Sequence, residues 1–281
     1  MFSKPVWKWI NLAVFICMVI VSVLAETIPL AGYTTGKISA LYPSPLAPAP
    51  LAFAIWWVIY LYLAIFWIVH LFSKASPCVI EALGPWFIIS CIANIAWIFT
   101  WHYRLMSLAM LSIAILLVSL IVIEYRLRDT RETVYQRWFI RAPFSIYYGW
   151  ITVATIVNVS VWLSVLGFNG FGWPSQLWQV IVLFIGGAIL CLGTWVNRDV
   201  LYGLAGLWGY AGIMIRQLSL DTVGGTYFWS LAAIVINGAA ILFTVMIVAF
   251  ACPVFDMPVL NRIGKDKMST DPINGGKNHE K

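Results

Sequence analysis

The sequence has 281 residues, of which 62% are hydrophobic and 10% are charged, and its formal net charge is +6. Because soluble domains carry about a quarter charged residues, this composition excludes a soluble globular protein and indicates a polytopic membrane protein. The basic residues are scattered at the ends of apolar runs and not clustered, which argues against a nucleic-acid-binding protein.

Eight apolar runs follow one another along the chain, each long enough to cross a bilayer core, which takes about 20 residues. The seventh run is marginal. The first run also resembles a signal peptide ending at Ala25. We interpret it as an uncleaved span, because residues 26–42 would otherwise be a short stranded tail. The eight runs are 9–30, 51–71, 79–101, 105–123, 143–166, 177–196, 200–218 and 227–251.

The positions of the lysines and arginines predict the orientation. If the first run leaves the cytoplasm, fourteen basic residues fall in inside segments and only Lys37, Arg104 and Arg216 fall outside. This bias satisfies the positive-inside rule. It predicts an all-α membrane protein, an eight-span helical bundle with both termini cytoplasmic. The polar tail at 256–281 is expected to be disordered.

The second run is preceded by a proline-rich approach and carries an unusual number of aromatic residues. The prolines deny the approach helical hydrogen bonds, and the segment 31–50 is a candidate lid over the outer end of the bundle. Within the run, Trp56, Tyr60 and Trp67 share one helix face. The prolines are Pro43, Pro45, Pro48 and Pro50.

Polar and aromatic side chains of three runs are predicted to meet at one depth in the outer half of the membrane. Counting about 1.5 Å per residue places Trp56 level with Trp97 and Trp162. A buried amide must be paired, so Asn94 and Asn158 should face inward. Aromatic walls with a few polar groups suit a flat apolar ligand. The predicted contacts are Trp56, Trp57, Tyr60, Asn94, Trp97, Tyr147, Trp150, Ala154, Asn158 and Trp162.

Simpler roles compete with ligand binding at several of these positions. Asn94, Asn158 and Asn237 could serve only as hydrogen-bonding links between helices. Many aromatic residues are expected to form belts at the membrane interfaces. The expected belt residues are Trp7, Trp9, Trp101, Tyr103, Trp138, Trp173, Trp178, Tyr202, Tyr227 and Trp229.

Other features narrow the function class. The seventh run carries Gly203, Gly206, Gly209 and Gly212, for which close helix packing is favoured over a permeation path. The ionisable residues are expected at inner span ends in reach of water, and none at mid-depth, which argues against an ion-coupled pump. They are His70, Glu81, Glu124, Arg198 and Asp199.

Neither metal-ligand spacing nor a nucleotide motif is present. The five cysteines, at positions 17, 78, 91, 191 and 252, show no ligand or disulfide pattern. No metal site is therefore predicted, and any use of ATP would need a separate subunit. The sequence also offers no paired acids and no nucleophile with a base, so no enzyme is predicted.

The sequence resembles the TspO/MBR family, the tryptophan-rich sensory proteins related to the translocator protein. The run PAPLAFAIWWVIYLYL is similar to its second span, with the W-x-x-x-Y step at Trp56 and Tyr60. The segments ANIAW and RAPFSIYYGWITVATIVNVSVWL resemble its third and fifth spans. The resemblance covers about residues 9–166. It implies a five-helix bundle with a pocket beneath the loop that joins the first two spans, known to bind porphyrins, sterols and related ligands.

The sequence and the resemblance together predict three segments: a TspO-like five-span bundle at 1–166, a three-span extension at 167–255 and the tail at 256–281. We expect a non-enzymatic protein of the bacterial inner membrane. It would bind a flat hydrophobic molecule, a tetrapyrrole or sterol-like ligand, for sensing or transport, with no cofactor required. The alternatives are a permease subunit with a partner ATPase and an enzyme acting on bound tetrapyrrole. The oligomeric state is left open, a homodimer included.

Overall fold

A computed structural model describes residues 4–28, 30–42, 46–72, 76–127, 137–220 and 228–251. These residues contain α-helices and short turns, and no strand, so the all-α prediction is confirmed for them. The tail at 256–281 lies outside the described residues. The helices are α1 (Lys4–Thr27), α2 (Thr35–Leu41), α3 (Ile55–Phe72), α4 (Ser76–His102), α5 (Met106–Leu127), α7 (Ala142–Val165), α8 (Ser175–Asn197), α9 (Val200–Leu220) and α10 (Phe228–Ala251).

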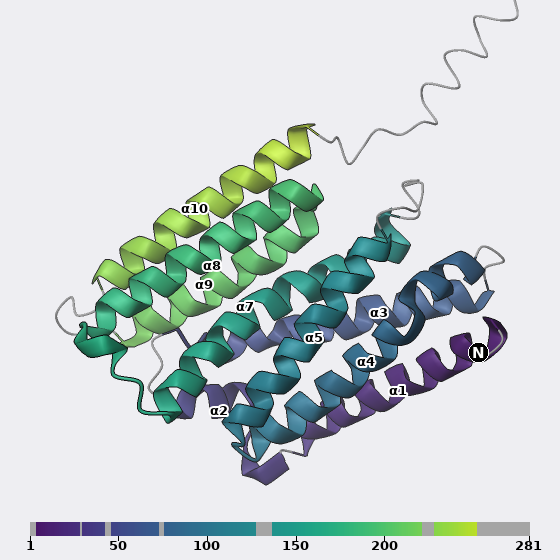
Figure 1. The fold of residues 1–281 in the computed structure, drawn as a ribbon, viewed down its shortest axis with the longest axis horizontal. Helices are drawn as coiled ribbons and strands as arrows, with labels where there is room; N and C mark the ends of the chain where they lie inside the picture. The colour runs from purple at the N-terminus through teal and green to yellow at the C-terminus, as the bar shows by residue number, and fades with distance from the viewer. Residues whose placement is uncertain are drawn as a thin grey trace, which may run out of the picture.

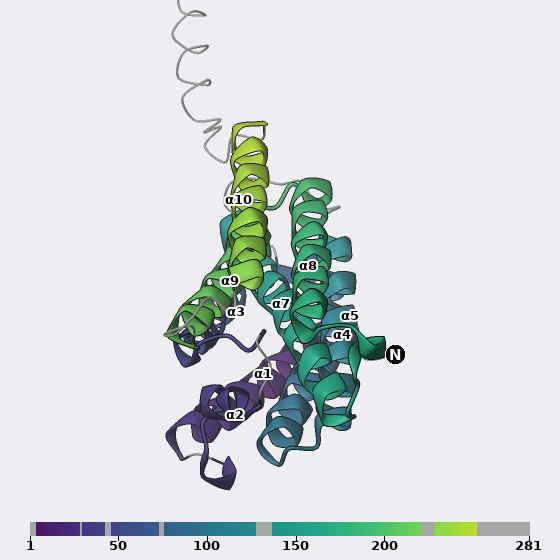
Figure 2. The same ribbon diagram turned by 90° about the vertical axis from the view of Figure 1, so that its left-hand side faces the viewer.

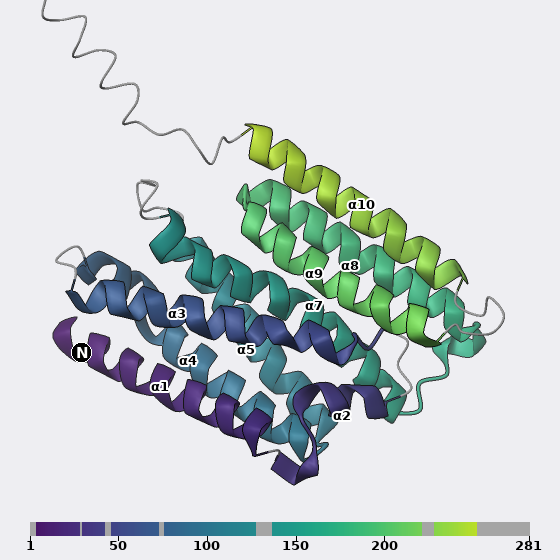
Figure 3. The same cartoon turned by 180° about the vertical axis from the view of Figure 1, so that it is seen from behind.

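Seven of the described helices are long and apolar enough to cross a membrane, namely those at Val6–Thr27, Pro50–Leu71, Val79–His102, Met106–Leu127, Trp138–Val165, Leu177–Asn197 and Phe228–Phe250. They establish a multi-pass membrane protein. The helix α9 is not among them, because its glycines, its aromatic residues and Arg216 dilute its apolar character. It nevertheless lies alongside α8 and α10 (Figure 3).

The long helices form two groups that lie side by side (Figure 1). In the first group α1 packs on α4, α4 on α5, α5 on α7 and α7 on α3. The ring is closed by the contact of Phe15 on α1 with Trp67 on α3, whose ring centroids are 6.5 Å apart. In the second group α10 packs on both α8 and α9 (Figure 2). The helix α9 joins the groups, because it also packs on α7.

Glycines allow the close approach of α9 to its neighbours. A Cβ atom at Gly149 of α7 would lie 2.4 Å from the backbone oxygen of Tyr202, and one at Gly209 would lie 2.7 Å from the Val153 side chain. These distances are too short for any side chain. The glycines of the seventh run therefore serve helix packing, as predicted.

A buried ionic cluster connects the two groups near the end of the bundle that lies opposite α2. Arg141, where the π-helical turn η3 (Arg137–Arg141) meets α7, lies 3.4 Å from Glu124 of α5 and 3.8 Å from Asp199 at the start of α9. The Ser145 hydroxyl donates to Asp199 Oδ2 at 2.5 Å, and Asp199 Oδ1 accepts from the Tyr202 N–H at 3.0 Å. Buried charges must be paired and hydrogen-bonded, and this arrangement meets that requirement.

The burial of three ionisable side chains corrects one prediction. Glu124, Asp199 and His70 were expected at span ends in reach of water, but each has less than a tenth of its surface exposed. The reason is that neighbouring helices cover them, which a single span does not reveal. Glu81 is exposed, as expected.

The interface belts are also smaller than predicted. Trp9, Trp173 and Trp229 are more than half exposed, as belt residues should be. Trp101 and Tyr202 are buried, so the belt interpretation is wrong for them. The Trp101 N–H donates to the Thr35 carbonyl at 3.3 Å, and the Tyr202 hydroxyl lies 3.3 Å from Thr152 Oγ1.

The close approach of α7 and α9 gives a stability prediction. Replacing a helical glycine by alanine usually stabilises a helix by about 1 kcal/mol. At Gly149 the new methyl would meet backbone, so Gly149→Ala should cost about 1–3 kcal/mol by overpacking. The measurement is the melting temperature of the purified protein in detergent. Gly238→Ala is the matched control, because the nearest atom to its Cβ is 3.8 Å away. Equal melting temperatures for the two variants would contradict the packing account.

Candidate functional site

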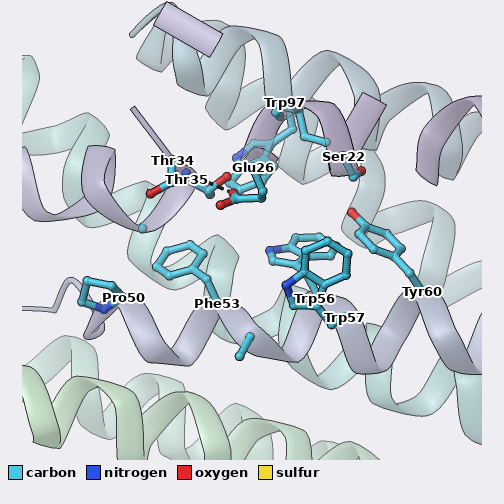
Figure 4. A pocket seen from close by; sticks show the side chains of 14 residues that line it. Ser22, Glu26, Thr34, Thr35, Pro50, Phe53, Trp56, Trp57, Tyr60 and Trp97 are labelled. Carbon is cyan, nitrogen blue, oxygen red and sulfur yellow. Dashed lines mark hydrogen bonds between the residues drawn. The ribbon is translucent and has the colours of Figure 1, made fainter. Parts of the chain in front are cut away.

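A cavity of about 230 Å³ lies at the end of the bundle that carries α2 (Figure 4). It is bounded by α1, α3 and α4, by α2, and by the 3-10 turn η2 (Pro50–Ala54) that leads into α3. This is the level at which the sequence predicts a pocket. The lining residues are Ser22, Ala25, Glu26, Thr34, Thr35, Gly36, Pro50, Phe53, Ala54, Trp56, Trp57, Tyr60, Trp97 and Ile98.

One wall of the cavity is built of aromatic rings. Trp56 and Tyr60 are one helical turn apart on α3 and stack with centroids 5.5 Å apart and an interplanar angle of 22°. Trp97 of α4 lies 5.8 Å from Trp56. Spacing of i and i+4 puts the first pair on one face, and helix packing adds the third ring. These three rings give the cavity a polarisable aromatic wall.

The two asparagines hold α4 and α7 together behind this wall. Asn94 Nδ2 donates to the Tyr147 hydroxyl at 2.9 Å, and the Trp97 indole N–H donates to Asn158 Oδ1 at 3.1 Å. Asn158 Nδ2 is in turn bonded to its own helix, at the Ala154 carbonyl. The prediction that both amides face inward is therefore confirmed by their position, and both are buried.

A second, narrow cavity of about 10 Å³ lies on the α7 side, and Trp97, Trp150, Ala154 and Asn158 are among its walls. Trp150 also lies 6.3 Å from Trp56 with the rings nearly perpendicular. Of the polar atoms that the structure describes here, the Trp150 indole N–H, Asn94 Oδ1 and the Ser39 hydroxyl are buried without a hydrogen-bond partner. Such groups are costly to bury unpaired. The Trp150 indole N–H and the Ser39 hydroxyl belong to residues that line this narrow cavity, which has room for no more than a water molecule.

Not every predicted contact lines a cavity: Asn94, Tyr147 and Trp162 are among the lining residues of neither cavity, and Trp57 differs by its exposure. Trp57 lines the cavity, yet it is 51% exposed, so it marks the side on which the cavity opens. Trp162 does not line either of these cavities, and its indole N–H donates to Ser107 Oγ of α5 at 3.0 Å. A ligand contact at any of the ten positions stays a prediction.

Sequence reasoning missed the polar and small residues that α1 and α2 contribute. Glu26 Oε1 accepts a hydrogen bond from the Thr35 N–H at 3.1 Å. Because the Thr35 carbonyl is held by Trp101, α2 is fixed to both α1 and α4. The predicted lid is thus folded over the cavity at 35–41, whereas residues 43–45 lie outside the described residues. The available signal was a lone acid, Glu26, near the end of the first apolar run.

The helix α9 supports the cavity from outside. The Ala49 N–H donates to the Gly212 carbonyl at 2.9 Å, and the Trp208 indole N–H donates to the Ala52 carbonyl at 2.9 Å. These bonds position η2, which carries Phe53 into the cavity wall (Figure 4). The second group of helices therefore helps to shape the site.

Comparison with known proteins adds one result to this geometry. A family model described as TSPO-like protein matches residues 8–252, which include both helix groups. Comparisons with curated proteins and with solved structures gave no match. A match over this much of the chain, on a helical bundle that carries the predicted aromatic and amide cluster, identifies the family: the chain belongs to the TSPO-like proteins.

Proposed function

We propose that this TSPO-like protein binds a flat hydrophobic small molecule, of tetrapyrrole or sterol-like shape, in the cavity beneath α2, for sensing or transport. The observation that carries the proposal is the cavity of about 230 Å³ with the stacked rings of Trp56 and Tyr60 on one wall. Ring faces attract flat apolar ligands through large contact areas. The unpaired polar atoms of Asn94 and Trp150 lie just behind that wall.

The size of the cavity indicates how such a ligand would lie. Small-molecule pockets usually measure about 300–1,000 Å³, so a tetrapyrrole would fill the cavity and extend through the open side. Trp57, half exposed at that side, would cover the projecting part. A ligand entering from the membrane would need no aqueous path.

The protein is proposed to act without catalysis and without a required cofactor. The parts involved would be the aromatic wall of the cavity and α2, which covers it as a roof. A ligand changes the state of a protein only when it binds two conformations differently. The hydrogen bond between Glu26 and Thr35, which fixes the roof, is one contact that a ligand could exchange.

We further propose eight membrane spans with both termini in the cytoplasm, in the inner membrane of a bacterium. The bias of basic residues supports this orientation. So does the fold, because the first residues of α1 and the last residues of α10 lie at the same end of the bundle (Figures 1 and 3). In this arrangement α9 crosses the membrane although it is less apolar, since α7, α8 and α10 cover much of its surface.

Ligand binding can be tested by the quenching of tryptophan fluorescence with protoporphyrin IX. The double variant Trp56→Ala with Trp97→Ala removes two ring contacts, each worth about 0.5–1.5 kcal/mol, so the apparent affinity should fall roughly tenfold. The measurement is a titration of the purified protein in detergent or nanodiscs.

The matched control is Trp9→Ala with Trp229→Ala, which removes the same number of tryptophans from exposed positions and should leave the affinity unchanged. Because Trp97 also bonds Asn158, the single variant Trp56→Ala is included in case the double variant is unstable. Unchanged affinity in both variants would remove the proposed site.

The span count has its own test. A green fluorescent protein fused after residue 281 should be fluorescent and an alkaline phosphatase fused there should be inactive, because an eight-span chain returns to the cytoplasm. Active phosphatase would contradict the proposed cytoplasmic C-terminus and, with the N-terminus in the cytoplasm, an even number of spans.

A further inference from the structure

The described residues that line the cavity carry negative charge and no positive charge. Among the described residues that line the cavity, Glu26 alone carries a formal charge. The basic residues of this end of the bundle, Lys37, Arg104 and Arg216, do not belong to the lining, and Lys37 and Arg104 are exposed. Arg104 instead lies over the Tyr33 ring, with its guanidinium carbon 5.3 Å from the ring centroid.

The Glu26 carboxylate keeps hydrogen-bonding capacity toward the cavity. It points toward Thr35 above Phe53 and Trp56 (Figure 4). One oxygen accepts the Thr35 N–H at 3.1 Å, whereas a carboxylate offers about four acceptor positions. The described contacts of Glu26 therefore leave most of the acceptor capacity of its carboxylate available to a molecule in the cavity.

Several neighbouring polar groups are engaged within the protein. The Ser22 hydroxyl donates to the Met18 carbonyl at 2.8 Å and also hydrogen-bonds the Tyr60 side chain. The indole N–H groups of Trp97 and Trp101 are both used within the protein. A ligand therefore meets the Glu26 carboxylate on the α1 side and the aromatic rings of Trp56, Trp57 and Tyr60 on the α3 side. Ring faces also favour positive charge.

We propose that Glu26 is a specificity-determining residue that selects flat ligands with an N–H donor or a cationic group at one edge. A cation or donor would form a charge-assisted hydrogen bond with the carboxylate. A ligand with its own carboxylates would place like charges together in a partly desolvated site, which is unfavourable. This inference rests on the proposed function and names the ligand class that the same cavity prefers.

The test compares three porphyrins that share one ring: protoporphyrin IX with two carboxylates, its dimethyl ester, and its bis(aminoethyl) amide. Each is titrated into the full-length protein, and quenching of tryptophan fluorescence is measured. We expect the aminoethyl amide to bind about tenfold more tightly than the dicarboxylate, with the ester between them. The order in the unmodified protein tests the preferred ligand class, and the variants below test whether Glu26 sets it.

The variant Glu26→Gln removes the charge and keeps an oxygen that can accept the Thr35 N–H. We expect it to reduce the preference to about threefold or less. Glu81→Gln is the matched control, because it makes the same change of charge at an exposed position near the opposite end of α4. That variant should keep the full preference of the unmodified protein.

The outcomes separate the two proposals. Equal binding of the three porphyrins, tighter binding of the dicarboxylate, or an unchanged preference in Glu26→Gln would overturn the role of Glu26 and leave ligand binding standing. Absence of quenching by all three porphyrins would overturn the proposed function itself. The expected order, lost in Glu26→Gln and kept in Glu81→Gln, would support both.

Discussion

Pairing of polar groups inside an apolar bundle is the constraint on which the site depends. The Trp97 N–H and Asn158 Oδ1 meet at 3.1 Å, and Asn94 meets the Tyr147 hydroxyl at 2.9 Å. Water is scarce at this depth, so each of these groups would be costly to leave alone. The two bonds fix the level of α4 relative to α7, and with it the position of the aromatic wall formed with Trp56.

The helices α8, α9 and α10 contribute to the structure of the site. Along its length α9 bonds the turn η2 through the backbone of Gly212 and the indole of Trp208. At its start Asp199 joins Arg141 and Glu124 in a buried cluster. The match of the family model across both groups agrees with a single structural unit.

Much of the site could be predicted from sequence because helical periodicity is local. The i, i+4 spacing of Trp56 and Tyr60 dictates that they share a face, and a rise of about 1.5 Å per residue gives their depth. The penalty for an unpaired amide predicts that Asn94 and Asn158 turn inward. The positions of side chains on single helices could therefore be predicted from the sequence. The described side chains lie close to the places that these rules predict.

The sequence by itself determined the helices, their apolar character and the face on which the tryptophans and asparagines lie, because these follow from local composition and period. Only the tertiary structure decided what each face meets. It buried Trp101, Glu124 and Asp199, which sequence rules assign to water or to the interface, and it brought Glu26 into the cavity. The physical reason is that burial and cavity shape depend on how helices distant in the chain pack against one another, and no local pattern encodes that.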